Sequence, residues 1–151
     1  MKNKLKIIFT IFTIFLSSCG YTPIYKNPNS EKLIISNKVF SGNKIINKKI
    51  FNRLNLKEEN VNSGFELKLN SNLQISELAK DKSGNVTTYK TTITVYLVLI
   101  KEQEVFKERN FEKSFSYANL NNKFELSKYQ KEVENNLITT IAQGIKIFLD
   151  Y

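Results

Sequence analysis

Two hydrophobic periods follow one another along this chain, and together they predict its secondary structure. Residues 32–38 contain a short run of apolar, mostly β-branched side chains, which predicts a first strand. Residues 42–56 then change to a helical period, in which the apolar positions are Ile45, Ile46, Ile50, Phe51 and Leu54. We therefore expect a strand followed by an amphipathic helix.

From Phe65 the pattern changes to strict alternation, which predicts three long strands. The first strand carries its apolar side chains on one face, at Phe65, Leu67, Leu69, Leu73 and Ile75. Alternation resumes over residues 86–100 and again over residues 105–117, where Phe111, Phe115 and Tyr117 share a face. Turn-forming residues separate the runs at 81–85 and 101–104. The three runs should pair as an antiparallel meander.

The last element is a second amphipathic helix, after a break at the Asn-rich residues 118–123. Ser127 and Gln130 have capping-box spacing, which predicts that the helix begins there. A broad apolar stripe follows, made of Val133, Leu137, Ile138, Ile141, Ala142, Ile145, Phe148 and Leu149. Gly144 lies within the stripe and costs about 1 kcal/mol of helix propensity, which we expect close packing on the sheet to explain.

These elements define the expected fold class. Both helices need an apolar partner, and a meander with one apolar face provides it. We expect an α+β two-layer sandwich in the order β-α-β-β-β-α, with both helices packed on one face of a four-stranded, mostly antiparallel sheet. Residues 32–151 should form this single domain.

The N-terminus has the pattern of an export signal. Lys2, Lys4 and Lys6 precede ten mostly apolar residues, and Leu16-Ser17-Ser18-Cys19 follows. Ten helical residues span roughly 15 Å, too short for a hydrocarbon core about 30 Å thick. We expect residues 1–18 to be removed by cleavage between Ser18 and Cys19. An ordinary secretory signal is the alternative, but Cys19 is the only cysteine and has no disulfide partner.

The end of this signal resembles a bacterial lipoprotein signal, in which the cysteine is acylated and becomes the first mature residue. That resemblance implies lipidation of Cys19, with residues 19–31 as a lipidated N-terminus and tether that contains both prolines. Gly20 follows the cysteine where lipoproteins retained on the inner membrane usually carry Asp. The resemblance therefore implies a periplasm-facing protein anchored in the outer membrane.

Composition argues against catalysis. The chain has no His, a single Cys, and only Asp81 and Asp150 as aspartates, so metal clusters and Ser-His or Cys-His nucleophiles are excluded. Its paired glutamates lie in polar surroundings that suit a solvated face. The net charge of +9 is carried mostly by lysines spread along the chain, and export disfavours a nucleic-acid partner. We expect no enzyme activity and no cofactor.

Taken in order, the lipoprotein signal, the following Tyr21-Thr22-Pro23, the predicted elements and the strand end Ser114-Phe115-Ser116-Tyr117 resemble the LPS-assembly lipoprotein family, LptE. The resemblance covers essentially the whole mature chain. It implies a non-enzymatic plug and assembly partner of the LptD-like outer-membrane β-barrel that inserts lipopolysaccharide. The family also binds lipopolysaccharide. The alternative from the residues alone is a free periplasm-facing lipoprotein adaptor that binds a small apolar ligand or another protein.

The meander suggests where lipopolysaccharide could bind. Its up-down-up course brings the turn at 80–85 and the loop at 119–123 to the same end of the sheet, with Lys80, Lys82 and Lys123 at the rim. Clustered ammonium groups suit the phosphates of lipid A. The alternative is that these are ordinary loop lysines in a lysine-rich protein.

Overall fold

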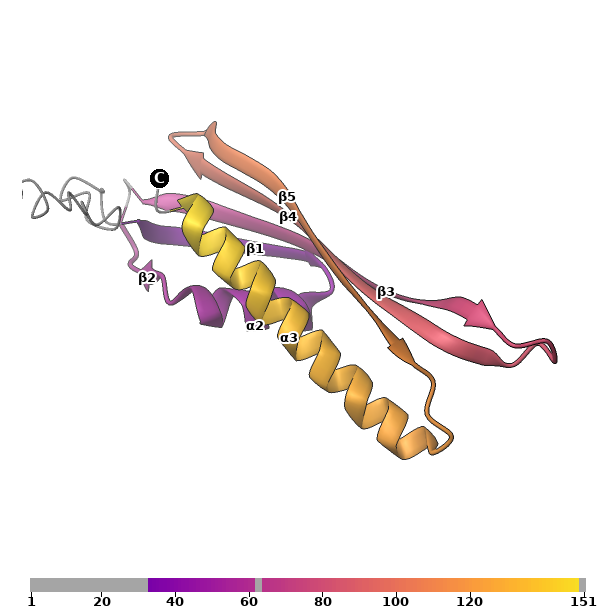
Figure 1. The fold of residues 1–151 in the computed structure, drawn as a ribbon. Coiled ribbons are helices and arrows are strands. Elements are labelled where there is room, and N and C mark those ends of the chain that lie inside the picture. Colours follow the sequence, from indigo (N-terminus) through magenta and orange to yellow (C-terminus); the bar gives the residue numbers. More distant parts are fainter. Residues whose placement is uncertain (1–32, 62–63, 150–151) are drawn as a thin grey trace, which may run out of the picture.

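Five strands form one sheet in the order β2-β1-β3-β4-β5 (Figure 1). The computed structural model describes residues 33–61 and 64–149. In chain order the elements are β1 (Ile34–Gly42), α2 (Lys44–Leu54), β2 (Lys57–Glu58), β3 (Phe65–Lys80), β4 (Val86–Lys101), β5 (Glu104–Ala118) and α3 (Lys123–Leu149). The predicted signal, the lipidated Cys19 and the tether lie outside the described residues.

The predicted meander is confirmed. β3 pairs antiparallel with β4, and β4 pairs antiparallel with β5, over nearly the full length of each strand. The β4–β5 turn contains no glycine, yet Glu102 and Gln103 both adopt positive φ, at 52° and 69°. This is the backbone conformation that a two-residue hairpin connection requires.

The α+β class is as expected, but the prediction of four strands is wrong. The additional strand, β2, has two residues and pairs in parallel with the start of β1. β1 is also longer than residues 32–38, because it pairs in parallel with β3 from Ile35 opposite Phe65 to Gly42 opposite Ser71. Its polar middle resembles a strand end in sequence, but pairing with β3 satisfies the backbone there.

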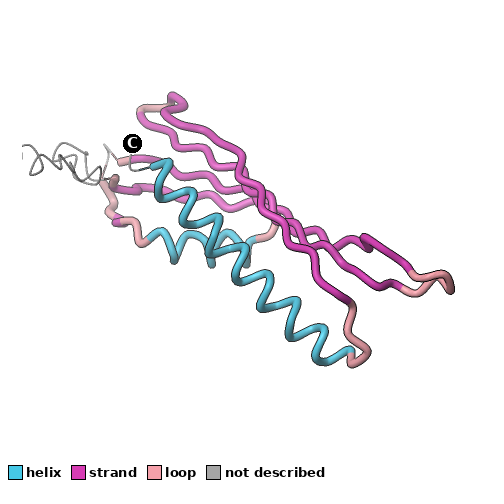
Figure 2. Tube along the Cα trace, viewed as in Figure 1, coloured by secondary structure: helices cyan, strands magenta, loops and turns pink. Residues whose placement is uncertain are grey.

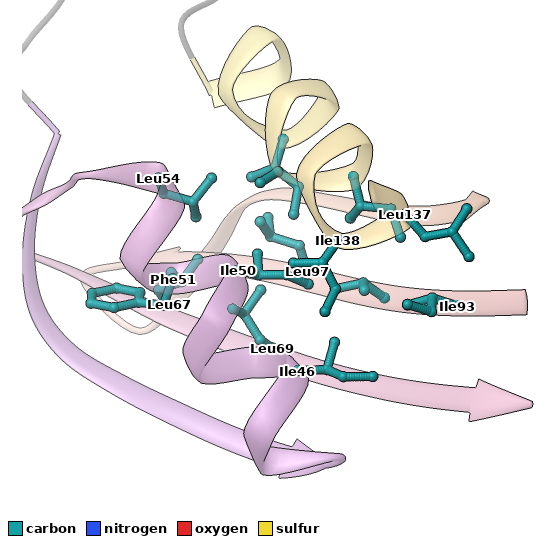
Figure 3. Packing of buried hydrophobic residues seen from close by; sticks show 14 of the residues in the cluster. Ile46, Ile50, Phe51, Leu54, Leu67, Leu69, Ile93, Leu97, Leu137 and Ile138 are labelled. Carbon is teal, nitrogen blue, oxygen red and sulfur yellow. The ribbon is translucent and has the colours of Figure 1, made fainter. Parts of the chain in front are cut away.

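Both helices lie on one face of the sheet, as predicted (Figure 2). α2 contacts β1 and β3, whereas α3 contacts β4, β5 and α2. Figure 3 shows side chains from both helices meeting the apolar face of β3 and β4, including Ile50 and Ile138 above Leu69 and Leu97. A salt bridge of 2.9 Å between Lys49 Nζ and Glu134 Oε1 joins the two helices at their surface.

The α2 stripe differs from the prediction at one position. Ile46, Ile50, Phe51 and Leu54 are buried, but Ile45 is 69% exposed. The fully buried polar side chain in this helix is Asn47, whose Nδ2 donates to the Ser41 carbonyl at 2.6 Å. The helix begins where the Asn43 side chain accepts a hydrogen bond from the Ile46 amide at 3.1 Å.

α3 has the predicted apolar stripe but begins four residues before the predicted Ser127. The Asn122 side-chain oxygen accepts hydrogen bonds from the amides of Phe124 at 2.9 Å and Glu125 at 3.3 Å. Asn122 is therefore the N-cap, and the helix starts at Lys123. The capping-box prediction at Ser127 and Gln130 is wrong because an earlier residue already satisfies the first amides.

Helix coverage of the sheet decreases along β3. We call the end with the turn 81–85 and the loop 119–122 the distal end. Leu67 and Leu69 are completely buried, Leu73 is partly buried, and Ile75 is 46% exposed. β1 leaves the sheet at Ser71, where the Asn43 amide donates to the Ser71 carbonyl at 2.8 Å. The predicted apolar face of β3 thus continues past the core into solvent at the distal end.

Candidate functional site

The β3–β4 turn presents two of the predicted lysines. Asp81 organises this turn, since its Oδ1 accepts hydrogen bonds from the amides of Ser83 at 2.8 Å and Asn85 at 2.9 Å. The Asn85 side chain also donates to Asp81 Oδ2 at 3.1 Å. These bonds, that of the Asn85 side chain foremost, lower the pKa of the Asp81 carboxyl below its ordinary value. Lys80 and Lys82 are therefore displayed on a well-defined turn.

The two lysines differ in electrostatic environment. Lys80 Nζ lies 2.9 Å from Glu77 Oε2, and this hydrogen bond raises the pKa of Lys80. Lys82 is exposed and forms no ion pair with any described residue. Lys80 is therefore charged but already partnered, whereas Lys82 offers its charge to solvent.

Lys123 is the first residue of α3, and Glu125 follows it in the first helical turn. The Asn119 amide donates to the Thr87 carbonyl at 2.8 Å, and its side chain donates to the Val86 carbonyl at 2.8 Å. These bonds hold the start of the β5–α3 connection beside the base of the β3–β4 turn. Lys123 lies further along that connection.

The three lysines do share the distal end, but they do not form one cluster. Figure 1 shows the β3–β4 turn and the start of α3 as two separate tips at that end of the molecule. No direct interaction among Lys80, Lys82 and Lys123 occurs in the described structure. The single rim that the sequence predicted is therefore two separate tips. The role of the three lysines in ligand binding stays a prediction.

Exposed apolar side chains accompany the lysines, and sequence reasoning missed them. Leu78 lies at an irregularity in the β3–β4 pairing, and Leu120 lies in the loop after β5. Phe124, directly after Lys123, is 78% exposed. The available signal was an apolar residue outside the expected alternation or stripe, which at Phe124 directly follows a lysine. The distal end therefore combines cationic and apolar groups.

A groove runs between α3 and β5. Its volume is about 340 Å³, and β5 contributes Lys113, Ser114 and Phe115 to its lining. The α3 side includes Tyr129, Val133 and Leu137. The Tyr117 ring lies close by, 5.6 Å from the Tyr129 ring and 6.0 Å from the Tyr89 ring. The groove is an apolar recess with polar side chains at its margins.

Nowhere in residues 33–61 and 64–149 do three His, Cys, Asp or Glu side chains gather as metal ligands would. In the same part of the chain, no helix has the length and apolar character needed to cross a membrane.

The fold is shared with solved bacterial lipoproteins. A minor lipoprotein from Acinetobacter baumannii has a TM-score of 0.64 at 12% identity, covering 79% of this chain and 91% of that one. The rare lipoprotein B from Shewanella oneidensis gives 0.57 at 17% identity, with coverages of 76% and 99%. An uncharacterized lipoprotein B from Nitrosomonas europaea gives 0.57 at 12%, with 78% and 84%.

At these identities the likeness establishes the fold alone. No family model matches the sequence, and no curated protein matches it either.

Proposed function

We propose that the chain is a lipid-anchored outer-membrane protein that acts as a plug and assembly partner of the LptD-like β-barrel that inserts lipopolysaccharide. The observation that carries the proposal is the fold, shared over most of the chain with solved lipoproteins. The sequence adds the signal ending at Ser18 and Cys19 and the resemblance to LptE. The proposed role is non-enzymatic.

The surface is compatible with a position inside a barrel. Lumens of outer-membrane barrels are polar, so a plug needs a polar exterior on most sides. The sheet face away from the helices carries Lys68, Asn70 and Thr94 among other polar side chains, and Thr94 donates to Glu112 at 3.4 Å. The side chains of Tyr96 and Glu108 form a further polar bond on this face, and it raises the pKa of the Tyr96 hydroxyl.

The distal end supports lipopolysaccharide as a ligand. Lipid A presents phosphates and acyl chains, and this end presents Lys82 and Lys123 together with Leu78 and Phe124. Phosphate oxygens accept hydrogen bonds from ammonium groups, and acyl chains contact apolar side chains. Ligand binding is the part of the proposal that rests on this end alone.

Co-purification tests the plug. A chain with a C-terminal tag, expressed at native level and extracted in mild detergent, should be recovered in a stable one-to-one complex with an outer-membrane β-barrel. A Cys19→Ser chain, which lacks the acylation site, is the control for dependence on the anchor. If the lipidated chain runs alone in detergent, the plug is ruled out.

Mass spectrometry of the mature N-terminus tests the anchor separately. Cys19 should be the first residue and should carry acyl groups, with residues 1–18 absent. An intact signal, or cleavage elsewhere with an unmodified Cys19, would contradict outer-membrane anchoring.

The groove between α3 and β5 supports a second candidate, a free lipoprotein adaptor that binds a small apolar ligand. Its volume of about 340 Å³ lies at the lower end of small-molecule sites, and Val133 and Leu137 give it an apolar floor. This candidate requires that the lipidated chain be recovered without a barrel and with a bound small molecule.

A further inference from the structure

The free edge of β5 has two parts with different chemistry. β5 is the last strand of the sheet, so its backbone on the side away from β4 has no strand partner in the described chain. Its first ten residues include six charged ones, Glu104, Lys107, Glu108, Arg109, Glu112 and Lys113. Its last five, Ser114-Phe115-Ser116-Tyr117-Ala118, include none. Charged side chains protect exposed edges from pairing, so only the second part is unprotected.

The unprotected part is also regular. β5 pairs with β4 without interruption from Lys107 to Ala118. Among the other unpaired edges, the part of β3 beyond Ser71 is interrupted by irregularities between Glu77 and Lys80, and the outer side of β1 beyond Ile35 carries the charged Lys38. Irregular pairing disrupts the row of outward N–H and C=O groups that a new strand would need. The C-terminal part of β5 is therefore the edge best suited to accept a strand.

Aromatic side chains lie along this edge on the helix side of the sheet. Phe115 is 48% exposed and lines the groove, whereas Tyr117 is buried. The Tyr117 hydroxyl is hydrogen-bonded to the Thr91 hydroxyl at 3.0 Å. An incoming strand would cover Phe115 and the mouth of the groove.

We propose that this edge binds a second copy of the chain, with the two β5 strands pairing antiparallel about a two-fold axis at Ser116. In this register Phe115 of each copy lies opposite Tyr117 of the other, and Ser114 lies opposite Ala118. Directly opposite aromatic side chains on one face stabilise an antiparallel pair. The sheet becomes continuous across the dimer, and each Phe115 is covered by the other copy.

Charge restricts the register of the two β5 strands. An axis at Lys107, Glu108, Arg109, Glu112 or Lys113 would place that residue opposite itself. An axis at Asn110 would pair Lys107 with Lys113, and one at Phe111 would pair Arg109 with Lys113. Like charges directly opposite one another are destabilising.

Axes within residues 114–117 avoid these repulsions. The axis at Ser116 confines the central five pairs to uncharged residues and matches both aromatic side chains. An axis at Ser114 would instead place Phe115 opposite Lys113, and one at Phe115 would place Tyr117 opposite Lys113. An axis at Tyr117 would place Phe115 opposite Asn119, which lies beyond the end of β5.

The dimer goes beyond the proposed function and does not depend on it. Few residues pair directly, so the interface is smaller than that of a tight complex, and we expect weak association in solution. Confinement of lipidated chains to a membrane surface would raise their effective concentration.

The test is a charge swap on the axis in the purified chain from residue 20 onward. Ser116 is exposed but lies opposite Lys90 of β4, so Ser116→Lys should melt slightly below the parent chain and Ser116→Glu at or slightly above it, with both variants folded. Sedimentation equilibrium should show each variant alone as a monomer, because two like charges meet on the axis. An equimolar mixture should dimerise at least tenfold more tightly than either variant alone.

Ser76→Lys is the matched control, since Ser76 is half-buried on β3 and, like Ser116, lies opposite Lys90, and this variant should leave the dimer intact. A parent chain that stays monomeric at millimolar concentration overturns the proposal. Rescue by a Ser114→Lys and Ser114→Glu mixture, but not by the Ser116 pair, overturns this register. Barrel co-purification is measured independently, so failure of the dimer is distinguishable from failure of the plug.

Discussion

Gly42 packs against the Ser71 carbonyl oxygen so closely that a Cβ at position 42 would overlap it. Gly42 also has φ +67°, a conformation that L side chains rarely adopt. This contact lies where the chain leaves β1 and enters α2, so it fixes both the end of the strand pairing and the start of the helix.

We therefore expect Gly42→Ala to destabilise the domain by at least about 2 kcal/mol, from backbone strain and displacement of β3. Chemical denaturation of the chain from residue 20 onward measures the loss. Gly84→Ala is the control, because Gly84 has φ +85° but open space around it. Gly84→Ala should lower the free energy of unfolding only by the backbone strain, about 1 kcal/mol. Equal losses in the two variants would show that the contact with Ser71 is unimportant.

At Gly144, in contrast to Gly42, we expect replacement by alanine to stabilise the domain. A Cβ there would meet the Phe111 ring at 3.7 Å, which is ordinary van der Waals contact. The sequence suggested that this glycine allows close packing of helix on sheet, but the spacing leaves room for a methyl group. Gly144→Ala should stabilise the domain by about 1 kcal/mol through helix propensity. A lower thermal midpoint in that variant would mean that α3 lies closer to β5 than described.

Ile141 is fully buried on the sheet side of α3, whereas Ile147 on the same helix is 58% exposed. Burial of an unpaired carboxylate costs several kcal/mol, comparable to the whole stability of a small domain. Ile141→Asp should abolish the cooperative thermal transition, and Ile147→Asp should change it little. If both variants melt alike, the register of α3 is wrong.

Long elements with a regular hydrophobic period were predictable from the sequence, whereas helix starts at which two residues could serve as the cap were not. Period-two alternation identified β3 and β4 because each buries one face against the helices, whereas β5 was identified by its aromatic positions, of which Tyr117 is buried and Phe111 partly buried. The start of α3 was missed because Asn122 competes with Ser127 as a cap, and only the fold shows which side chain reaches the amides. β2 was missed because two polar residues carry no period.

The candidate site was less predictable than the fold. The meander brought the three lysines to one end, but sequence could not show that Glu77 partners Lys80 or that α3 extends away as a second tip. The groove was missed because its lining combines residues of β5 with residues on a helix face. Such sites depend on the packing angle between elements, which periodicity does not specify.

The stability of the turn around Asp81 should depend on pH. Hydrogen bonds from Asn85 and Ser83 lower the pKa of the carboxyl in the folded chain. A lowered folded pKa means that stabilisation is present above the unfolded value and is lost as pH falls through the folded one. NMR titration should place the Asp81 midpoint below 3.8, and Asn85→Ala should move it upward. A midpoint unaffected by Asn85→Ala would contradict the described turn.

Lipopolysaccharide binding tests the distal lysines. Lys82→Ser with Lys123→Ser should weaken binding roughly thirtyfold, at about 1 kcal/mol for each partly exposed charge contact if the two act additively. Adding Lys80→Ser should change affinity less, because Lys80 is already paired with Glu77. Binding should weaken as salt rises, since exposed charges are screened.

A control of equal charge separates a local site from bulk attraction. Lys44 and Lys48 are exposed on α2 and form no ion pair with other described residues, so Lys44→Ser with Lys48→Ser removes the same charge elsewhere. Lys49 and Arg53 are unsuitable, because Lys49 pairs with Glu134 and Arg53 donates to the Lys49 carbonyl at 3.2 Å. Isothermal titration with purified lipopolysaccharide compares the two variants. If they lose equal affinity, the attraction is bulk charge and the distal end is not a binding site.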